Sequence, residues 1–179
     1  MNRFSYGSGS IKTEVNVNSV IENTITISRN EWKHIADLKT DLDPNIKTII
    51  GQANEIGQVF LNIIINATHA ISEAARNTSR RGVILITSKN IDDGVKISIQ
   101  DNGAGIPSDI HDKIFNLFFT TKTIGNGTGQ GLAIAYDIVV KKHFGRIFFT
   151  SESGHGTTFH VIFPFASTST DDHGTEDSA

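Results

Sequence analysis

The sequence contains no cysteine, which excludes disulfide bonds and thiolate metal sites and suits a reducing compartment. No apolar stretch is long enough to cross a membrane, because the most apolar one, residues 59–75, is interrupted by Asn62, Asn66, Thr68 and His69. The first ten residues lack the apolar core of a signal peptide. A formal net charge of −3 gives no reason to expect a general binder of nucleic acids or membrane surfaces.

Several catalytic and nucleotide-binding signatures are also missing. The chain has no Gly-x-x-x-x-Gly-Lys-Ser/Thr sequence, which excludes a P-loop, and residues 125–131 do not fit the Rossmann pattern Gly-x-Gly-x-x-Gly in any register. Histidines, aspartates and glutamates do not recur at the spacing of zinc ligands, and no Ser-His-Asp arrangement or nucleophile elbow is evident. The functional residues must therefore lie in other patterns.

Hydrophobic periodicity predicts alternating helices and strands in a chain of 179 residues, long enough for one domain with a core. Helices are expected over residues 17–30, 56–74 and 131–142, and strands over residues 32–42, 83–87, 95–101, 147–150 and 157–163. This order predicts a two-layer α/β sandwich in which helices cover one apolar face of a sheet.

Composition changes at both ends of the chain set the expected domain boundaries. Residues 1–14 form a loose lead-in with alternating Gly and Ser, residues 15–165 form the domain, and residues 166–179 form an acidic tail. Because the tail consists largely of Ser, Thr, Asp and Glu, we expect it to be disordered.

The expected helix over residues 56–74 carries a polar row beside its apolar face. Asn62 and Asn66 are four residues apart in that row, so they stack on one face, although Asn disfavours helix interiors. Their amide oxygens are neutral, hard ligands of the kind that Mg²⁺ accepts. The alternative, and the more common role, is that both amides bridge backbone groups inside the core. His69 either donates to an anion or is an ordinary surface histidine.

Asp101 ends an expected strand on the same side as that strand's apolar residues, so its carboxylate needs a partner. The amino group of adenine would supply two N–H donors in such a pocket. Gly103 and Gly105 follow, and they allow the backbone to approach a flat base. The alternative is that this segment is an ordinary tight turn.

Residues 125–131 are rich in glycine and lead into an expected helix, which would offer backbone N–H groups to phosphates. The alternative is a flexible hinge. Lys122 either meets the charge of the phosphates or is an ordinary solvated lysine. Phe115, Phe118 and Phe119 are expected to pack in the core and anchor the glycine-rich segment.

Taken in order, these segments resemble the N, G1, F, G2 and G3 boxes of sensor histidine kinases. The matching sequences are Asn62-x-x-x-Asn66-Ala67, Asp101-x-Gly103-x-Gly105-Ile106, Phe115-x-x-Phe118-Phe119, Gly127-Thr128-Gly129-Gln130-Gly131-Leu132 and Gly154-x-Gly156-Thr157-Thr158-Phe159. Each box is unspecific alone, whereas five in this order are specific. The resemblance implies an α+β, Bergerat-type ATP-binding fold with a mixed, mostly antiparallel sheet of about five strands, three helices on one face and a flexible ATP lid.

The resemblance also implies a role for each matching residue. Asn66 would be the Mg²⁺ ligand, and Asn62 would stand where ATP-hydrolysing relatives carry a glutamate base. Because an amide cannot take a proton, the site should position phosphate and hydrolyse ATP slowly. Asp101 would accept from adenine, helped by Thr157 through water, and Ile106 would line the base. The other implied nucleotide-binding residues are His69, Gly103, Gly105, Phe115, Thr121, Lys122, Gly127, Thr128, Gly129, Gln130, Gly131 and Leu132.

The function implied by the resemblance is transfer of the γ-phosphoryl of Mg-ATP to a histidine, and from there to a response regulator, in two-component signal transduction. His34, expected in a strand, and His111, expected in the lid, lack the surroundings of an acceptor histidine. The acceptor is therefore expected on a separate dimerisation domain, with residues 1–14 as a residual linker. Two alternatives of the same fold are a regulatory nucleotide-binding module and an anti-sigma-type serine kinase.

The resemblance carries expectations about assembly and location as well. The fragment should be a monomer and the full-length kinase a homodimer, without a nucleic acid partner. It should reside in the cytoplasm, either as a free protein or as the cytoplasmic part of a membrane-bound sensor.

Overall fold

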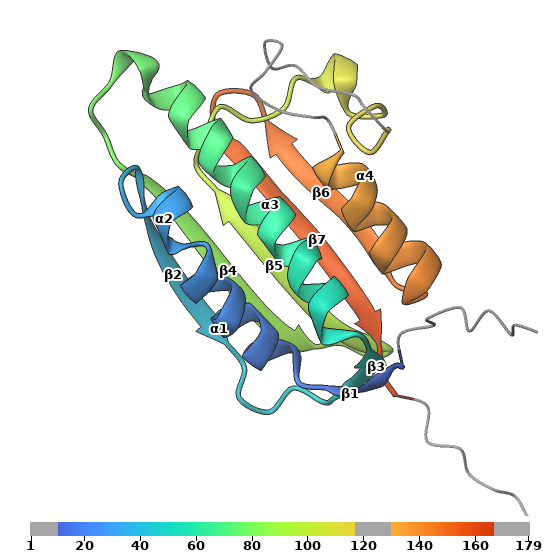
Figure 1. Cartoon of the computed structure of the whole chain (residues 1–179). Coiled ribbons are helices and arrows are strands. Elements are labelled where there is room, and N and C mark those ends of the chain that lie inside the picture. Colours follow the sequence, from blue (N-terminus) through green and yellow to red (C-terminus); the bar gives the residue numbers. More distant parts are fainter. Residues whose placement is uncertain (1–10, 117–129, 167–179) are drawn as a thin grey trace, which may run out of the picture.

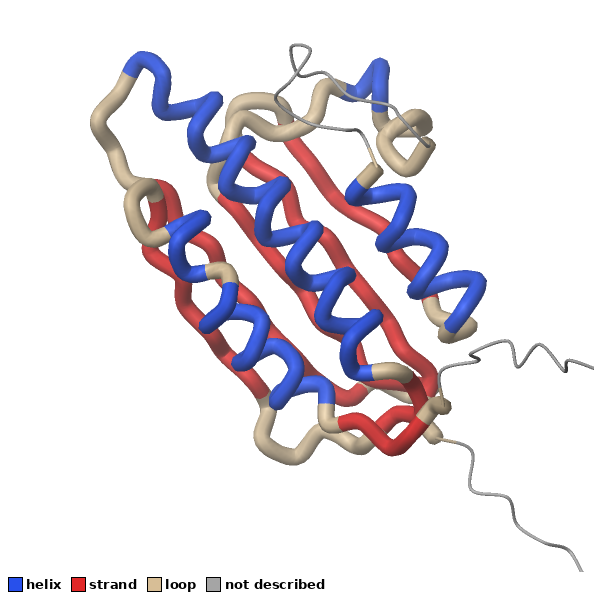
Figure 2. The backbone as a smooth tube through the Cα atoms, in the orientation of Figure 1, coloured by secondary structure: helices blue, strands red, loops and turns tan. Residues whose placement is uncertain are grey.

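The computed structural model describes residues 11–116 and 130–166, which form a sheet covered on one face by helices (Figures 1 and 2). The sheet has the strand order β2-β4-β5-β7-β6. Its strands are β2 (Ala36–Leu42), β4 (Gly82–Asn90), β5 (Gly94–Asp101), β6 (Arg146–Glu152) and β7 (Gly156–Pro164). β2 runs parallel to β4, and the other neighbours are antiparallel. The predicted mixed, mostly antiparallel sheet of five strands is confirmed.

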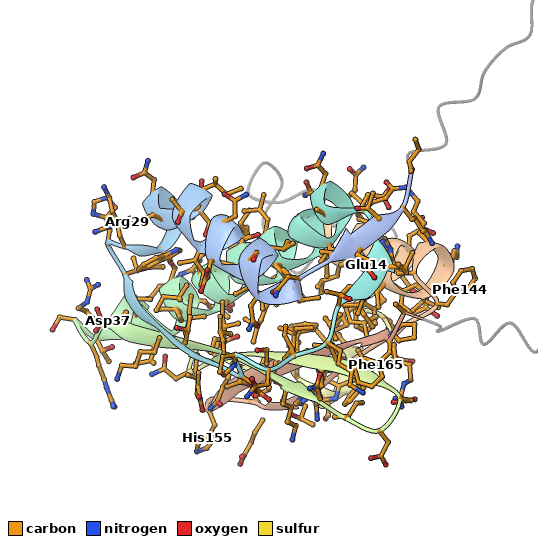
Figure 3. All side chains as sticks on the ribbon, turned by 90° about the horizontal axis from the view of Figure 1, so that it is seen from below. Glu14, Arg29, Asp37, Phe144, His155 and Phe165 are labelled. Atoms are coloured by element: carbon orange, nitrogen blue, oxygen red, sulfur yellow. The ribbon has the colours of Figure 1, made fainter. Side chains whose placement is uncertain are left out.

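Three helical segments cover the sheet: α1 (Val17–Ile27), α3 (Ala53–Ala74), and α4 (Gly131–Tyr136), which continues as the π-helix η3 (Asp137–Lys142). Figure 1 shows these three lying side by side on one face, and Figure 3 shows the helices above the sheet. Within the described residues, no helix lies on the other face. The short helices are α2 (Arg29–Trp32), η1 (Ala75–Asn77) and η2 (Ser108–Ile110). No helix in the described ranges is long and apolar enough to cross a membrane.

The core forms between α3 and the strands. The predicted apolar face of α3 is buried at Ile56, Val59, Phe60, Ile63, Ile64, Ala67 and Ile71. Ala74, which the periodicity also placed there, is exposed at the end of the helix. In β5, Val95, Ile97 and Ile99 are buried under the helices, and Asp101 is buried on the same side. Each fully buried aliphatic side chain contributes roughly 1.5–3 kcal/mol relative to exposure.

The prediction of a strand over residues 32–42 is wrong at its start. Trp32 ends α2, and His34 lies in a turn, so β2 begins only at Ala36. The Arg81 guanidinium stabilises this turn by donating to the carbonyl oxygens of Lys33, His34 and Ala36 at 2.8–3.2 Å. The bonding partner lies more than forty residues away, so local periodicity could not reveal the turn.

Two further features escape the sequence patterns. The expected helix over residues 17–30 is divided at Ser28, whose backbone N–H donates to the carbonyl oxygen of Thr24. A two-stranded antiparallel sheet of β1 (Thr13–Val15) and β3 (Ile49–Gly51) lies at the edge of the domain. Three-residue strands are too short for alternation to be recognised.

η3 is fixed to the start of α3 by His143, which is buried. Its Nε2 accepts from the backbone N–H of Gln52 at 3.1 Å, so Nδ1 carries the proton and donates to the carbonyl oxygen of Ile138 at 2.8 Å. Burial lowers the pKa of His143, although the bond to Ile138 opposes this shift. Lys142 adds an ion pair with Glu55 at 2.9 Å. This end of the helix pair is therefore firmly held.

Candidate functional site

Asp101 lies at the end of β5 with only 5% of its surface exposed. Its Oδ1 accepts from the backbone N–H of Gly103 at 2.8 Å. Burial raises the pKa of Asp101 from 3.8 to about 6, and the backbone N–H groups of Gly103 and Thr157 limit the rise. No ion pair with Asp101 is found among the described side chains. A buried carboxylate without a cation costs stability, which marks a candidate binding residue.

The turn after Asp101 packs directly on the C-terminal half of α3. The backbone N–H of Ala104 donates to the carbonyl oxygen of Ala70 at 3.0 Å. A Cβ at Gly103 would lie within 2.7 Å of three Ala70 atoms, two of them in the backbone, so this close approach requires glycine. Gly105 follows with a φ of 73°. The turn is therefore held beside the asparagine-bearing helix.

Ser151 on β6 connects this turn to Thr157 on β7. Its Oγ accepts from the backbone N–H of Ile106 at 2.7 Å and lies 2.8 Å from the hydroxyl of Thr157. Thr157 is buried and pairs with Asp101 across the β5–β7 ladder. Sequence reasoning missed Ser151, and no local pattern distinguishes it from other strand serines.

Asn62 and Asn66 lie on the same face of α3 but differ in their contacts. Asn62 is 9% exposed; its Nδ2 donates to the carbonyl oxygen of Gly131 at 2.9 Å, and its Oδ1 accepts from Nε2 of Gln58 at 2.7 Å. Asn66 is half-buried one turn further along and shares neither of these bonds. His69 is exposed beyond it. The amide of Asn66 is therefore the more exposed of the two.

Phe115 is half-buried in a cluster of aromatic rings that come from α4, β6 and β7 and pack against the core. Its ring lies 5.7 Å from Tyr136, 6.1 Å from Phe149 and 6.3 Å from Phe159 between centroids. Such edge and tilted arrangements are typical of packed aromatic cores. The packing role expected for Phe115 is confirmed, although its contacts with Phe149 and Phe159 were not predicted from the sequence.

Part of the expected phosphate segment lies outside the described residues: Phe118, Phe119, Thr121, Lys122, Gly127, Thr128 and Gly129. Gln130 directly precedes α4, and Gly131 and Leu132 are its first residues. The helix therefore begins at the place predicted, next to Asn62.

A shallow polar hollow of about 380 Å³ opens at the same end of the sheet. Strand alternation directs the side chains of Gln100, Thr150 and Thr158, which line it, to the uncovered face. His155, also in its lining, lies on the side away from the helices (Figure 3). Asp101, Ser151 and Thr157 also contribute to its lining, so the hollow adjoins the candidate site from the uncovered side of the sheet.

The residues present fit a nucleotide with a hard divalent cation better than a protein-only metal centre. Within the described ranges, no group of three or more His, Asp or Glu side chains surrounds a common point. A single amide such as Asn66 suits Mg²⁺, which keeps several waters and takes further oxygens from phosphates. The buried carboxylate of Asp101 suits an N–H donor of a base.

Comparisons with known proteins agree with this geometry. Residues 51–167 match the family model described as histidine kinase-, DNA gyrase B- and HSP90-like ATPase. The sensor histidine kinase ZraS of Escherichia coli (strain K12) is 34% identical over 161 residues, covering 89% of this chain and 32% of ZraS. This chain therefore spans about a third of that relative.

Two solved structures extend the comparison. The catalytic domain of the histidine kinase ThkA is 30% identical and superposes with a TM-score of 0.73 over 87% of this chain and 96% of that domain. ThkA in complex with the response regulator TrrA is 27% identical with a TM-score of 0.68, covering 86% of this chain and 41% of the other. The chain therefore belongs to the histidine kinase-, DNA gyrase B- and HSP90-like ATPase family and, within it, to the catalytic domains of sensor histidine kinases.

Proposed function

We propose that this domain binds Mg-ATP and delivers the γ-phosphoryl group to a histidine on a separate dimerisation domain. The observation that carries the proposal is the buried carboxylate of Asp101, which has no ion pair among the described side chains and whose turn packs against the helix that bears Asn66. A domain of this family uses ATP, and the two side chains supply the two kinds of contact that ATP needs. Asp101 recognises a base, and Asn66 holds the metal.

Bound Mg-ATP supplies the transferable phosphoryl group, and this chain supplies position and charge neutralisation. Asp101 accepts a hydrogen bond from the adenine amino group, Thr157 assists through water, and Ile106 lines the base. Asn66 coordinates Mg²⁺. Gly131 and Leu132 at the start of α4 would meet the phosphates, together with His69. Gly127, Gly129 and Lys122, which lie outside the described residues, are proposed to contribute to the same contact. Asn62 cannot act as a base, so hydrolysis by this domain alone is slow.

The proposed phosphoryl transfer also requires two protein partners. The acceptor histidine lies on a dimerisation domain, supplied by the native protein or in trans, and a response regulator receives the phosphoryl group from it. Support for the second partner comes from ThkA, whose structure was solved with the response regulator TrrA. The native kinase would act as a homodimer on the cytoplasmic side of the cell.

The decisive experiment supplies radiolabelled ATP and a separate helical dimerisation domain from a related kinase such as ZraS. We expect a label on that domain that is lost in acid and survives alkali, as phosphohistidine is. A dimerisation domain with its acceptor histidine replaced by glutamine serves as the control and should stay unlabelled. ATP binding without any label would favour a regulatory module, and an acid-stable label would favour a serine kinase.

The metal role of Asn66 predicts a loss that depends on magnesium. In Asn66→Ala, the affinity for Mg-ADP should fall about tenfold, because a ligand of the cation is removed, whereas ADP in EDTA should bind almost as to the wild type. Calorimetry in the two buffers measures both. Asn54→Ala, an exposed asparagine in the first turn of α3, is the matched control. Equal losses in both buffers would show that Asn66 has a structural role only.

A further inference from the structure

Side-chain contacts join α3 to α4 and its continuation η3 at two places. At the far end, His143 accepts from the backbone of Gln52, and Lys142 pairs with Glu55. At the near end, beside the nucleotide-binding region, the amide of Asn62 donates to the carbonyl oxygen of Gly131 at 2.9 Å. Gly131 is the first residue of α4. The position of the helix start relative to Asn66 therefore depends on Asn62.

The orientation of the Asn62 amide follows from its partners. A backbone carbonyl oxygen can only accept, so the NH₂ group of Asn62 must face Gly131. Its Oδ1 is then directed to Gln58, whose Nε2 donates to it at 2.7 Å. Gln58 lies one turn before Asn62, away from Asn66. The oxygen of Asn62 is thus occupied by a protein donor and does not point toward the cation.

Burial strengthens this arrangement. Asn62 is 9% exposed and lies against the backbone of α4, since a Cβ at Gly131 would be 3.7 Å from its Cβ and Cγ, an ordinary packing distance. A buried amide whose donor and acceptor groups are both bonded has a fixed rotamer. Releasing Oδ1 to a metal would leave Nε2 of Gln58 without this acceptor.

We infer that Asn62 is a positioning residue that fixes the start of α4 for nucleotide binding, and that Gln58 orients its amide. The inference rests on the proposed function and refines it, because Asn62 acts through Gly131 and Leu132 rather than on the metal or the phosphate. It also assigns different roles to the two asparagines on this face of α3. Asn66 contacts the ligand, and Asn62 holds the adjoining helix in place.

Asn62→Asp distinguishes this role from metal ligation. A carboxylate is a better Mg²⁺ ligand than an amide, but it has no N–H for Gly131 and repels that carbonyl oxygen. A positioning role therefore predicts that ADP affinity falls about tenfold in Mg²⁺ and about tenfold in EDTA. A ligand role predicts equal or tighter binding of Mg-ADP and a loss only in EDTA, where no cation offsets the repulsion between the carboxylate and the phosphates. Calorimetry in both buffers measures the two losses.

Gln58→Ala tests the same chain of contacts from a residue outside the binding site. It should lower ADP affinity about two- to threefold, equally with and without Mg²⁺, because the amide of Asn62 is no longer oriented. Hydrogen exchange of the amides in residues 131–136 supplies a measurement without nucleotide. Exchange should be faster in Asn62→Asp and in Gln58→Ala than in the wild type, and unchanged in the control Asn66→Ala.

The inference is overturned if Mg-ADP affinity of Asn62→Asp equals or exceeds that of the wild type, or if exchange in α4 is the same in all variants. Its failure is separable from failure of the proposed function. A wild-type domain that binds no ADP would contradict the proposed function, whereas the exchange measurement would still decide whether Asn62 holds α4.

Discussion

An Asp101→Asn protein should bind ADP at least about tenfold more weakly than the wild type and yet be no less stable at pH 7. The loss of affinity has two causes. The amide presents NH₂ toward adenine as readily as oxygen, and it carries no charge to attract the amino group. The Oδ1 bond to the backbone N–H of Gly103 can be kept, so the turn itself should survive.

The stability of this variant follows from the raised pKa of Asp101. The folded protein holds a proton on this carboxyl up to pH about 6, whereas the unfolded chain releases it near 3.8. Between these pH values the native state binds more protons, so the wild type loses stability as pH rises through the window. The shift corresponds to roughly 3 kcal/mol at 1.36 kcal/mol per pKa unit, a loss that Asp101→Asn avoids.

Urea unfolding from pH 4 to pH 7 checks the stability and calorimetry checks the affinity. The wild type should show a decline between pH 4 and pH 6 that Asp101→Asn lacks. Asp41→Asn is the matched control, because Asp41 is an exposed aspartate on β2 far from the site, and it should keep the decline. Unchanged ADP affinity in Asp101→Asn would refute the adenine contact. If the stability of Asp101→Asn declined with pH as that of the wild type does, the decline would not come from ionisation of buried Asp101.

Gly156→Ala should be the most destabilising of the single substitutions considered, costing at least about 3 kcal/mol. Gly156 has a φ of 126°, a conformation that residues with a Cβ rarely adopt. A Cβ there would also lie closer than 3 Å to the carbonyl oxygen of Asp101, which belongs to the neighbouring strand. β5 and β7 would have to separate where Asp101 and Thr157 pair.

Gly154→Ala distinguishes the cost of backbone strain from the cost of the Cβ clash. Gly154 also has a positive φ, 85°, but a Cβ there would meet nothing within 4 Å. It should therefore cost only the backbone strain, roughly 1–2 kcal/mol. Thermal unfolding should show a fall of about 6–12 °C for Gly156→Ala and about 2–8 °C for Gly154→Ala, at 2–4 °C per kcal/mol. Equal falls would mean that β7 moves away from Asp101 at no cost.

Features with a long, regular period were predictable from the sequence. The burial of α3 follows from apolar residues three and four apart, and the burial of Asp101 follows from the alternation of β5. Features that depend on distant partners were not predictable. The turn at His34 needs Arg81, which lies 47 residues away. Only polar residues separate Ile27 from Trp32, so hydrophobic periodicity gives no signal for the break at Ser28.

The candidate site shows the same division. Asp101, Asn66 and Thr157 were identified because their motifs occur in a fixed order. Ser151 was not identified, since its importance comes from the backbone N–H of Ile106, 45 residues away. The two amides of α3 were treated alike, because spacing places Asn62 and Asn66 on one face but cannot show which one is covered. That difference arises from the packing of α4, 69 residues beyond Asn62.

The uncovered face of the sheet has a practical consequence for experiments on this protein. Gln100 and Asp101 are neighbours in β5, yet Gln100 is exposed and Asp101 is buried beneath the helices. Because the chain has no native thiol, one cysteine introduced at an exposed position far from Asp101, for example at Lys89 near the other end of β4, would be a unique attachment point. A dye there would report on docking partners without touching the base contact, and coupling to a sensor chip would orient the nucleotide site toward the solution.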